Sequence, residues 1–158
     1  MKKMLVSAAA IGFLAAGISF AAEHDHMQHE TMMKQEGQKS DDRTELKIPA
    51  PMKTMQKKMM RQHMATLSEI AAALAANDLN KAAAAAKTNL GWNQEEEKKC
   101  SMIEKMTGEP DFTKLGKAVH QKADELADAA KAGNRDKALA AMAELINNCN
   151  ACHNKFRH

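Results

Sequence analysis

The clearest pattern in the chain is a helical repeat of apolar positions between Pro51 and Ala76. Apolar residues recur every three or four positions there, so they fall on one side of an α-helix. The stripe runs through Met60, Leu67 and Leu74, seven residues apart, with His63 and Ile70 between them. Pro51 suits the first turn, where its missing N–H costs nothing. We therefore predict a long amphipathic helix over 51–76.

Further helices follow, bounded by residues that commonly start or stop helices. Asp78 is expected to cap the start of an alanine-rich helix over 79–90, and Gly91 to end it. Asp111 should cap a third long helix that ends at Gly133, and Asn134 should cap the last helix. A shorter helix is expected around Glu95–Met106, before Gly108 and Pro110. In the last helix the predicted core stripe is Leu139, Met142, Ile146, Cys149, His153 and Phe156.

Four long helices with short connections and one apolar stripe each predict an all-α fold. We expect an antiparallel four-helix bundle with up-down-up-down connections over residues 49–158. The predicted core consists of Ala, Leu and Met and contains little aromatic volume. Such a core is thin, and a buried apolar ligand would supply the missing bulk and stabilise the native state.

The N-terminal part differs in composition from the bundle. Residues 1–21 have the pattern of a secretory signal peptide, with Lys2 and Lys3 before an apolar run. A membrane anchor is the alternative, but the run is shorter than the ~20 apolar residues that span a bilayer. Residues 22–48 are polar and lack an apolar period, so we expect a flexible tail. The mature chain should reach the periplasm without stable membrane insertion.

Charge and aromatic content exclude one class of partner. The formal net charge is +3, and removal of Lys2 and Lys3 with the signal would lower it to +1. The mature chain keeps only Trp92, Phe112 and Phe156 as aromatic residues. There is no basic stripe with interleaved aromatics, so the sequence does not predict nucleic-acid binding.

The run from Cys149 to His153 reads Cys-Asn-Ala-Cys-His, which is the attachment signature of c-type haem. The thiols of Cys149 and Cys152 add to the two haem vinyl groups, and His153 donates a nitrogen to the iron as proximal ligand. A thiol–disulfide pair would sit at a helix N-terminus beside strands, whereas this run ends a helix. A zinc site would need a second pair of ligands, which is missing. We predict one covalent haem c.

The position of this motif and the four-helix layout resemble the cytochrome c prime family, the class II c-type cytochromes. The runs Met59–Leu67 and Gly116–His120 resemble a subgroup with related segments in its first and third helices. The resemblance covers roughly Pro51–Arg157. It implies a left-handed bundle in the periplasm, often a homodimer. High-spin relatives leave the distal side of the iron open and bind small gases, whereas low-spin relatives place a first-helix methionine there and transfer electrons.

The distal candidates are Met60 and His63, both on the stripe of the first helix. Met60 aligns with the methionine ligand of the low-spin relatives, and a thioether is a good axial ligand. Its alternative role is simple core filling. His63 is the alternative ligand, or a hydrogen-bonded core residue. Arg157, four residues after His153 and so one helical turn further on, is placed to bind the proximal histidine and the haem propionates, or it is a solvated terminal residue.

Two features lie outside the resemblance. Residues His24, His26, Met27, His29, Met32 and Met33 carry imidazole and thioether groups suited to copper, zinc or nickel, or are an accidental polar composition. Cys100 is a third cysteine beside Lys98 and Lys99, which would favour its thiolate. It is either a free thiol or a partner in an intermolecular disulfide.

These features together predict an electron carrier that exchanges electrons with redox partner proteins. No base–nucleophile pair surrounds the haem motif, so we expect no enzymatic activity. The alternative is a five-coordinate haem that binds NO or CO. A third hypothesis is a metal-handling protein that uses the N-terminal His/Met tract. The redox potential, the partners and the choice between monomer and dimer are not determined by the sequence.

Overall fold

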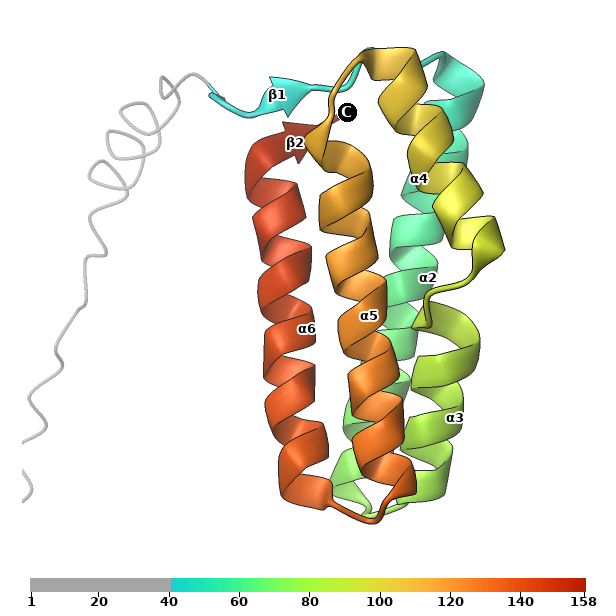
Figure 1. Ribbon diagram of the computed structural model, residues 1–158, viewed down its shortest axis with the longest axis vertical. Coiled ribbons are helices and arrows are strands. Elements are labelled where there is room, and N and C mark those ends of the chain that lie inside the picture. The colour runs from blue at the N-terminus through green and yellow to red at the C-terminus, as the bar shows by residue number, and fades with distance from the viewer. Residues whose placement is uncertain (1–40) are drawn as a thin grey trace, which may run out of the picture. The chain divides into compact units, whose positions relative to one another are not determined.

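The computed structural model describes residues 41–158, and helices dominate this part of the chain (Figure 1). The elements in chain order are β1 (Thr44–Glu45), α2 (Ala50–Ala75), α3 (Leu79–Leu90), α4 (Gln94–Thr107), α5 (Asp111–Lys131), α6 (Arg135–Lys155) and β2 (Phe156–Arg157). The predicted all-α four-helix bundle is confirmed. The second leg of the bundle is α3, and α4 continues it towards the end where β1 and β2 lie (Figure 1).

Most of the predicted helix boundaries are confirmed by hydrogen bonds. The side chain of Asp78 accepts a hydrogen bond from the Lys81 N–H at 3.0 Å, and that of Asn134 accepts one from the Lys137 N–H at 2.9 Å. Gly133 takes the left-handed conformation that the end of a helix requires, with φ of +75°. The prediction for Asp111 was wrong, because Pro110 is the cap and Asp111 is the first residue of α5.

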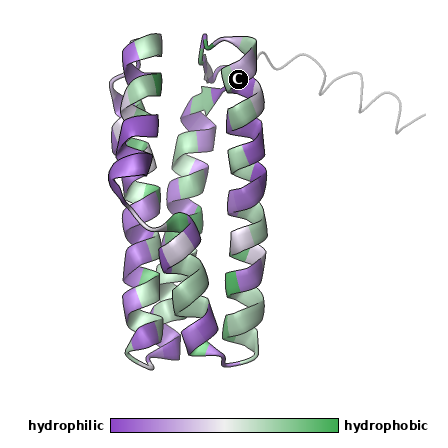
Figure 2. Ribbon diagram, turned by 90° about the vertical axis from the view of Figure 1, so that its right-hand side faces the viewer, coloured by the Kyte–Doolittle hydropathy of each residue, from purple (hydrophilic) through white to green (hydrophobic). Residues whose placement is uncertain are grey.

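The larger hydrophobic core is built largely from alanine. Its fully buried residues are Ile70, Leu74, Ala82, Ala86, Ala123, Leu126, Ala138 and Leu145, which come from all four legs of the bundle. Small side chains let neighbouring helix backbones approach closely. Figure 2 shows how apolar and polar residues alternate along each helix, with many pale green residues at the lower end, where α3 lies.

The buried face of α6 differs from the predicted one. Leu139 and Ile146 are each 39% exposed, whereas Ala138 and Leu145 are fully buried. Apolar residues are adjacent in this helix, so more than one stripe of apolar residues can be drawn along it. The predicted stripe, which included Leu139 and Ile146, was not the inner face. The inner face is centred one residue earlier, at Ala138 and Leu145, and Cys149 still packs against the core.

A smaller core lies at the end of the bundle that holds β1 and β2. The two strands are parallel, with Thr44 opposite Phe156 and Glu45 opposite Arg157. Leu46 is 1% exposed in this cluster, where it packs with Phe156 and other residues. The folded unit therefore begins at residue 42, upstream of the expected boundary at Pro49. The predicted signal peptide over 1–21, and the tail as far as Ser40, lie outside the described residues.

Within residues 41–158, none of the helices combines the length and apolarity needed to cross a membrane.

Candidate functional site

A cavity at the smaller core brings together the residues that the sequence singled out. Met60 and His63 on α2 line it together with Cys149, Cys152 and His153 on α6. The helices are antiparallel, so the beginning of α2 and the end of α6 lie at the same end of the bundle (Figure 1). Residues of α4 and α5 complete the wall: Glu96, Lys99, Cys100, Ile103, Phe112, Gly116, Val119 and His120.

Helices α2 and α6 are not packed tightly against each other. The closely packed pairs of helices are α5 with α6, α3 with α5, α2 with α3, and α4 with α5. The cavity therefore lies between two legs of the bundle that other helices hold in place.

The two motif cysteines lie on the inner side of α6 as unpaired thiols. Burial raises the pKa of Cys152 to about 11, with a smaller contribution from neighbouring Cys149. Burial also raises the pKa of Cys149. Both thiols are therefore protonated at neutral pH and face an apolar space. His153 is exposed and lies at the rim of the same cavity.

A second opening on the same side separates the two distal candidates. Met60, Cys152 and His153 line this opening together, with residues of β2 and the two residues that flank β1 around it. Met60 therefore shares both spaces with His153, whereas His63 lines only the inner cavity. Of the two candidates, Met60 is the one more closely associated with the cysteine–histidine motif.

His63 contacts another histidine deeper in the bundle. Its ring meets the edge of the His120 ring, with centroids 5.6 Å apart and planes at 86°. Burial, together with a smaller effect of the nearby His120, lowers the pKa of His63 to about 4. The imidazole of His63 is therefore neutral at neutral pH.

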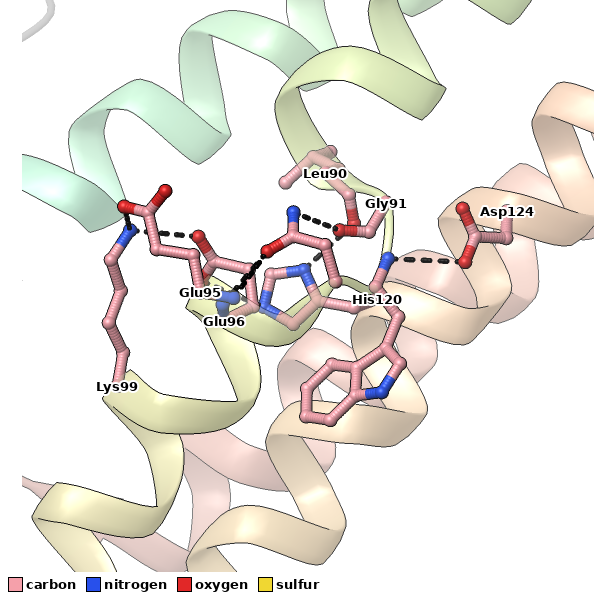
Figure 3. Close-up of polar contacts among 9 residues, drawn as sticks. Leu90, Gly91, Glu95, Glu96, Lys99, His120 and Asp124 are labelled. Atoms are coloured by element: carbon pink, nitrogen blue, oxygen red, sulfur yellow. Dashed lines mark hydrogen bonds and ion pairs between the residues drawn. The ribbon is translucent and has the colours of Figure 1, made fainter.

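His120 belongs to a polar cluster that the sequence did not predict (Figure 3). Its Nδ1 lies 2.8 Å from the backbone oxygen of Leu90. A carbonyl oxygen only accepts, so Nδ1 carries the proton and donates it. The other ring nitrogen, Nε2, lies 3.7 Å from the Glu96 carboxylate, which also pairs with Lys99 at 2.9 Å. These contacts fix the His120 ring in the wall of the inner cavity, where it packs against the ring of His63.

Gln56 is a second residue that sequence reasoning missed. Its side chain is only 4% exposed and lines both the inner cavity and the second opening. Among the described residues its Oε1 has no hydrogen-bond partner. Buried polar groups are normally paired, so this oxygen is a position where a bound group with a donor would fit. The available signal was a polar residue on the helix stripe, four positions before Met60.

Two arginines stand at the rim of the second opening. Arg157 lies in β2, because α6 ends at Lys155, so the expected helical-turn relation to His153 was wrong. It nevertheless lines the opening beside His153, with Nη2 3.6 Å from the Glu45 carboxylate. Arg43, just before β1, donates a hydrogen bond to the His153 backbone oxygen at 3.3 Å. The sequence did not predict Arg43 because the pairing of β1 with β2 that positions it joins segments far apart in the chain.

Cys100 belongs to the cavity and not to the surface. It is 8% exposed, and burial raises its pKa to about 11, with Glu96 contributing in the same direction. The expected thiolate was wrong, because burial outweighs the effect of neighbouring Lys99. A Cβ atom on Gly116 would lie 2.8 Å from the Cys100 Sγ, so the glycine makes room for the thiol.

The residues around this cavity fit a c-type haem. Two thiols three positions apart and an imidazole lie on one wall, and a thioether lies on the opposite wall. These groups match the two vinyl groups and two axial positions of the cofactor. Guanidinium groups at the rim match its carboxylates. Thiols alone would also suit a disulfide, but the thioether of Met60 and the imidazole of His63 on the facing helix would then have no role.

The comparison with protein families agrees with this donor set. Residues 47–157 match the sequence model of the family described as Cytochrome C'. The match spans α2 to β2, and Arg43 and β1 lie before it. Searches of curated proteins and of solved structures return no match.

Proposed function

The chain belongs to the cytochrome c′ family, whose members carry c-type haem, and on that premise we propose that it is a periplasmic electron carrier. One haem is joined to Cys149 and Cys152 through thioether bonds. When bound, it supplies an iron that alternates between the ferric and ferrous states. The carrier exchanges electrons with redox partner proteins, and two copies of the chain can form a homodimer.

His153 is the proximal ligand in this proposal, and Met60 is the distal one. The observation that carries the choice of Met60 is that it lines both openings with Cys152 and His153, whereas His63 does not. His63 also has another partner, the ring of His120. Two protein ligands leave no position for a substrate or a gas, which favours electron transfer over gas binding.

The remaining residues orient the group and shield it. Arg157 and Arg43 are proposed to bind the haem carboxylates at the rim, where both guanidinium groups lie near His153. Gln56 offers a buried amide that can donate or accept a hydrogen bond at the same edge. Phe112 and Ile103 are buried in the wall and exclude water from the cavity.

Visible spectra of the purified protein test the distal ligand. Methionine ligation predicts a low-spin ferric spectrum with a sulfur-to-iron charge-transfer band in the far red. Met60→Ala should abolish the band and allow rapid CO binding by the ferrous protein. Met64→Ala is the matched control, because Met64 lies on the same helix, is 65% exposed and lines neither opening.

Two other results would change the assignment. A wild-type protein that is already high-spin and binds CO at once would contradict electron transfer and favour gas binding. A low-spin wild type that lacks the sulfur-to-iron band, is unchanged by Met60→Ala and becomes high-spin in His63→Ala would make His63 the ligand.

A further inference from the structure

A groove between α2 and α4 brings four methionine side chains together on the outer side of the haem cavity. Met52, Met55 and Met59 line it from α2, and Met102 lines it from α4. The three α2 residues are spaced by three and four positions, so they lie on the same face of the helix. Half of the eight methionines in residues 41–158 therefore share one groove.

Core filling explains only part of this cluster, because Met52 packs against the smaller core but the other three methionines are not part of that core. Methionine commonly fills irregular gaps in a core, as Met142 does where it packs against the alanine-rich cluster. In the groove, however, Met55 is 49% exposed and Met102 is 42% exposed. Their thioethers can therefore be reached from solvent, while Met52 and Met59 are half-buried beneath them.

The charges around the groove decide which ligand suits it. Lys58 and Lys99 line it, and its wall contains no carboxylate, imidazole or thiol. The charge of Lys99 is balanced by Glu95 at 2.8 Å and Glu96 at 2.9 Å, and that of Lys58 repels multivalent cations. Divalent ions such as Ca²⁺ or Zn²⁺ prefer oxygen, imidazole or thiolate donors, whereas neutral thioethers suit the soft monovalent ion Cu(I).

We propose that this groove binds one Cu(I) ion through the sulfur atoms of Met52, Met55, Met59 and Met102. Met59 also lines the haem cavity, so it contributes to the wall between the two sites. Met60, the next residue, faces the cavity and is not part of the copper site. The proposal does not depend on which residue is the distal ligand of the iron.

The first test is a titration of the full-length, haem-loaded protein under reducing, oxygen-free conditions. Cu(I), supplied as its acetonitrile complex, is competed against bicinchoninate. The variant M52L/M55L/M59L/M102L keeps the volume and apolarity of the groove, because Leu and Met are similar in size. We expect it to bind one Cu(I) fewer than wild type. Met64→Leu, on the same helix but outside the groove, should bind as many ions as wild type.

The N-terminal His/Met tract can also bind Cu(I). Wild type and all variants retain this tract, so it contributes equally to each measurement. A second measurement identifies the ligands in the wild type. With ¹³C-labelled methionine methyl groups, Cu(I) should shift the resonances of Met52, Met55, Met59 and Met102. Equal binding by the fourfold variant, or shifts confined to Met27, Met32 and Met33, would overturn the proposal. The variant M55L/M102L leaves the cavity-lining Met59 in place, so weaker Cu(I) binding by it together with a wild-type haem spectrum separates the copper proposal from any failure of the electron-carrier assignment.

Discussion

The two ends of the bundle are packed in different ways. At the end where α3 lies, alanines and a few leucines such as Leu126 and Leu145 are fully buried and fill the space between the helices. At the other end the core contains larger side chains around a cavity, and a buried Gln56 oxygen has no partner among the described residues. The first end needs no ligand to be complete. In our proposal, a haem fills the space between α2 and α6 and completes the second end.

Removal of both thiols should have the largest effect, and it should be confined to the cavity end. The double variant C149S/C152S cannot form thioethers, so acid–acetone extraction should release all of its haem, whereas wild type should retain it. A bound ligand stabilises the native state, so thermal unfolding should begin at a lower temperature. Cys100→Ala is the matched control and should retain the haem. Extraction of haem from wild type would contradict covalent attachment.

Truncation of a core leucine at the alanine-rich end should lower stability without changing the haem spectrum. Leu126 is fully buried there, and replacement by alanine should lower the free energy of unfolding by about 2–5 kcal/mol. Guanidinium titration followed by circular dichroism measures this loss. A changed visible spectrum in Leu126→Ala would show that the two ends are not independent.

Acid should destabilise the cavity end through His63. The pKa of His63 is lowered from 6.5 to about 4 in the folded chain. As pH falls, the unfolded chain therefore takes up a proton at this residue at a higher pH than the folded chain does. The free energy of unfolding should therefore drop between about pH 6.5 and pH 4, by up to about 3 kcal/mol. His63→Gln should remove that part of the pH dependence. Identical pH profiles for wild type and variant would show that His63 is not buried as described.

A smaller effect is expected where Cys100 meets Gly116. The added methyl of Gly116→Ala would lie 2.8 Å from the Cys100 Sγ, and such crowding typically costs about 1–3 kcal/mol. Cys100→Ala removes the sulfur, so the double variant should recover most of this loss. If the two losses simply add, the thiol and the glycine are not in contact.

The alanine-rich end was the easier part to predict from the sequence. Helix periodicity and the local capping residues Asp78 and Asn134 determine where its helices begin, and these are interactions between near neighbours in the chain. The pairing of β1 with β2 was missed because two-residue strands have no periodicity and join distant segments. The inner face of α6 was misassigned because Leu139 and Ile146 are at least as large as Ala138 and Leu145, the residues that are buried beside them.

The cavity end was predictable only where a motif carries its own chemistry. Cys149, Cys152 and His153 are identified by their spacing, and the antiparallel bundle brings them to Met60 and His63. The parts played by Gln56, His120 and Arg43 depend on contacts between helices and strands far apart in the chain. The burial of Cys100 likewise follows from how α4 packs on α5, which its charged neighbours in the sequence concealed.

One measurement tests the central claim, that Met60 and His153 hold a haem between α2 and α6. In the ferrous low-spin protein, a methyl group on an iron-bound sulfur lies directly over the haem ring, and the ring current shifts its resonance far upfield. With ¹³C-labelled methionine methyls, we predict one such resonance, present in wild type and in Met64→Leu and absent in Met60→Leu. A spectrum with no upfield methionine methyl, or one that persists in Met60→Leu, would contradict the claim.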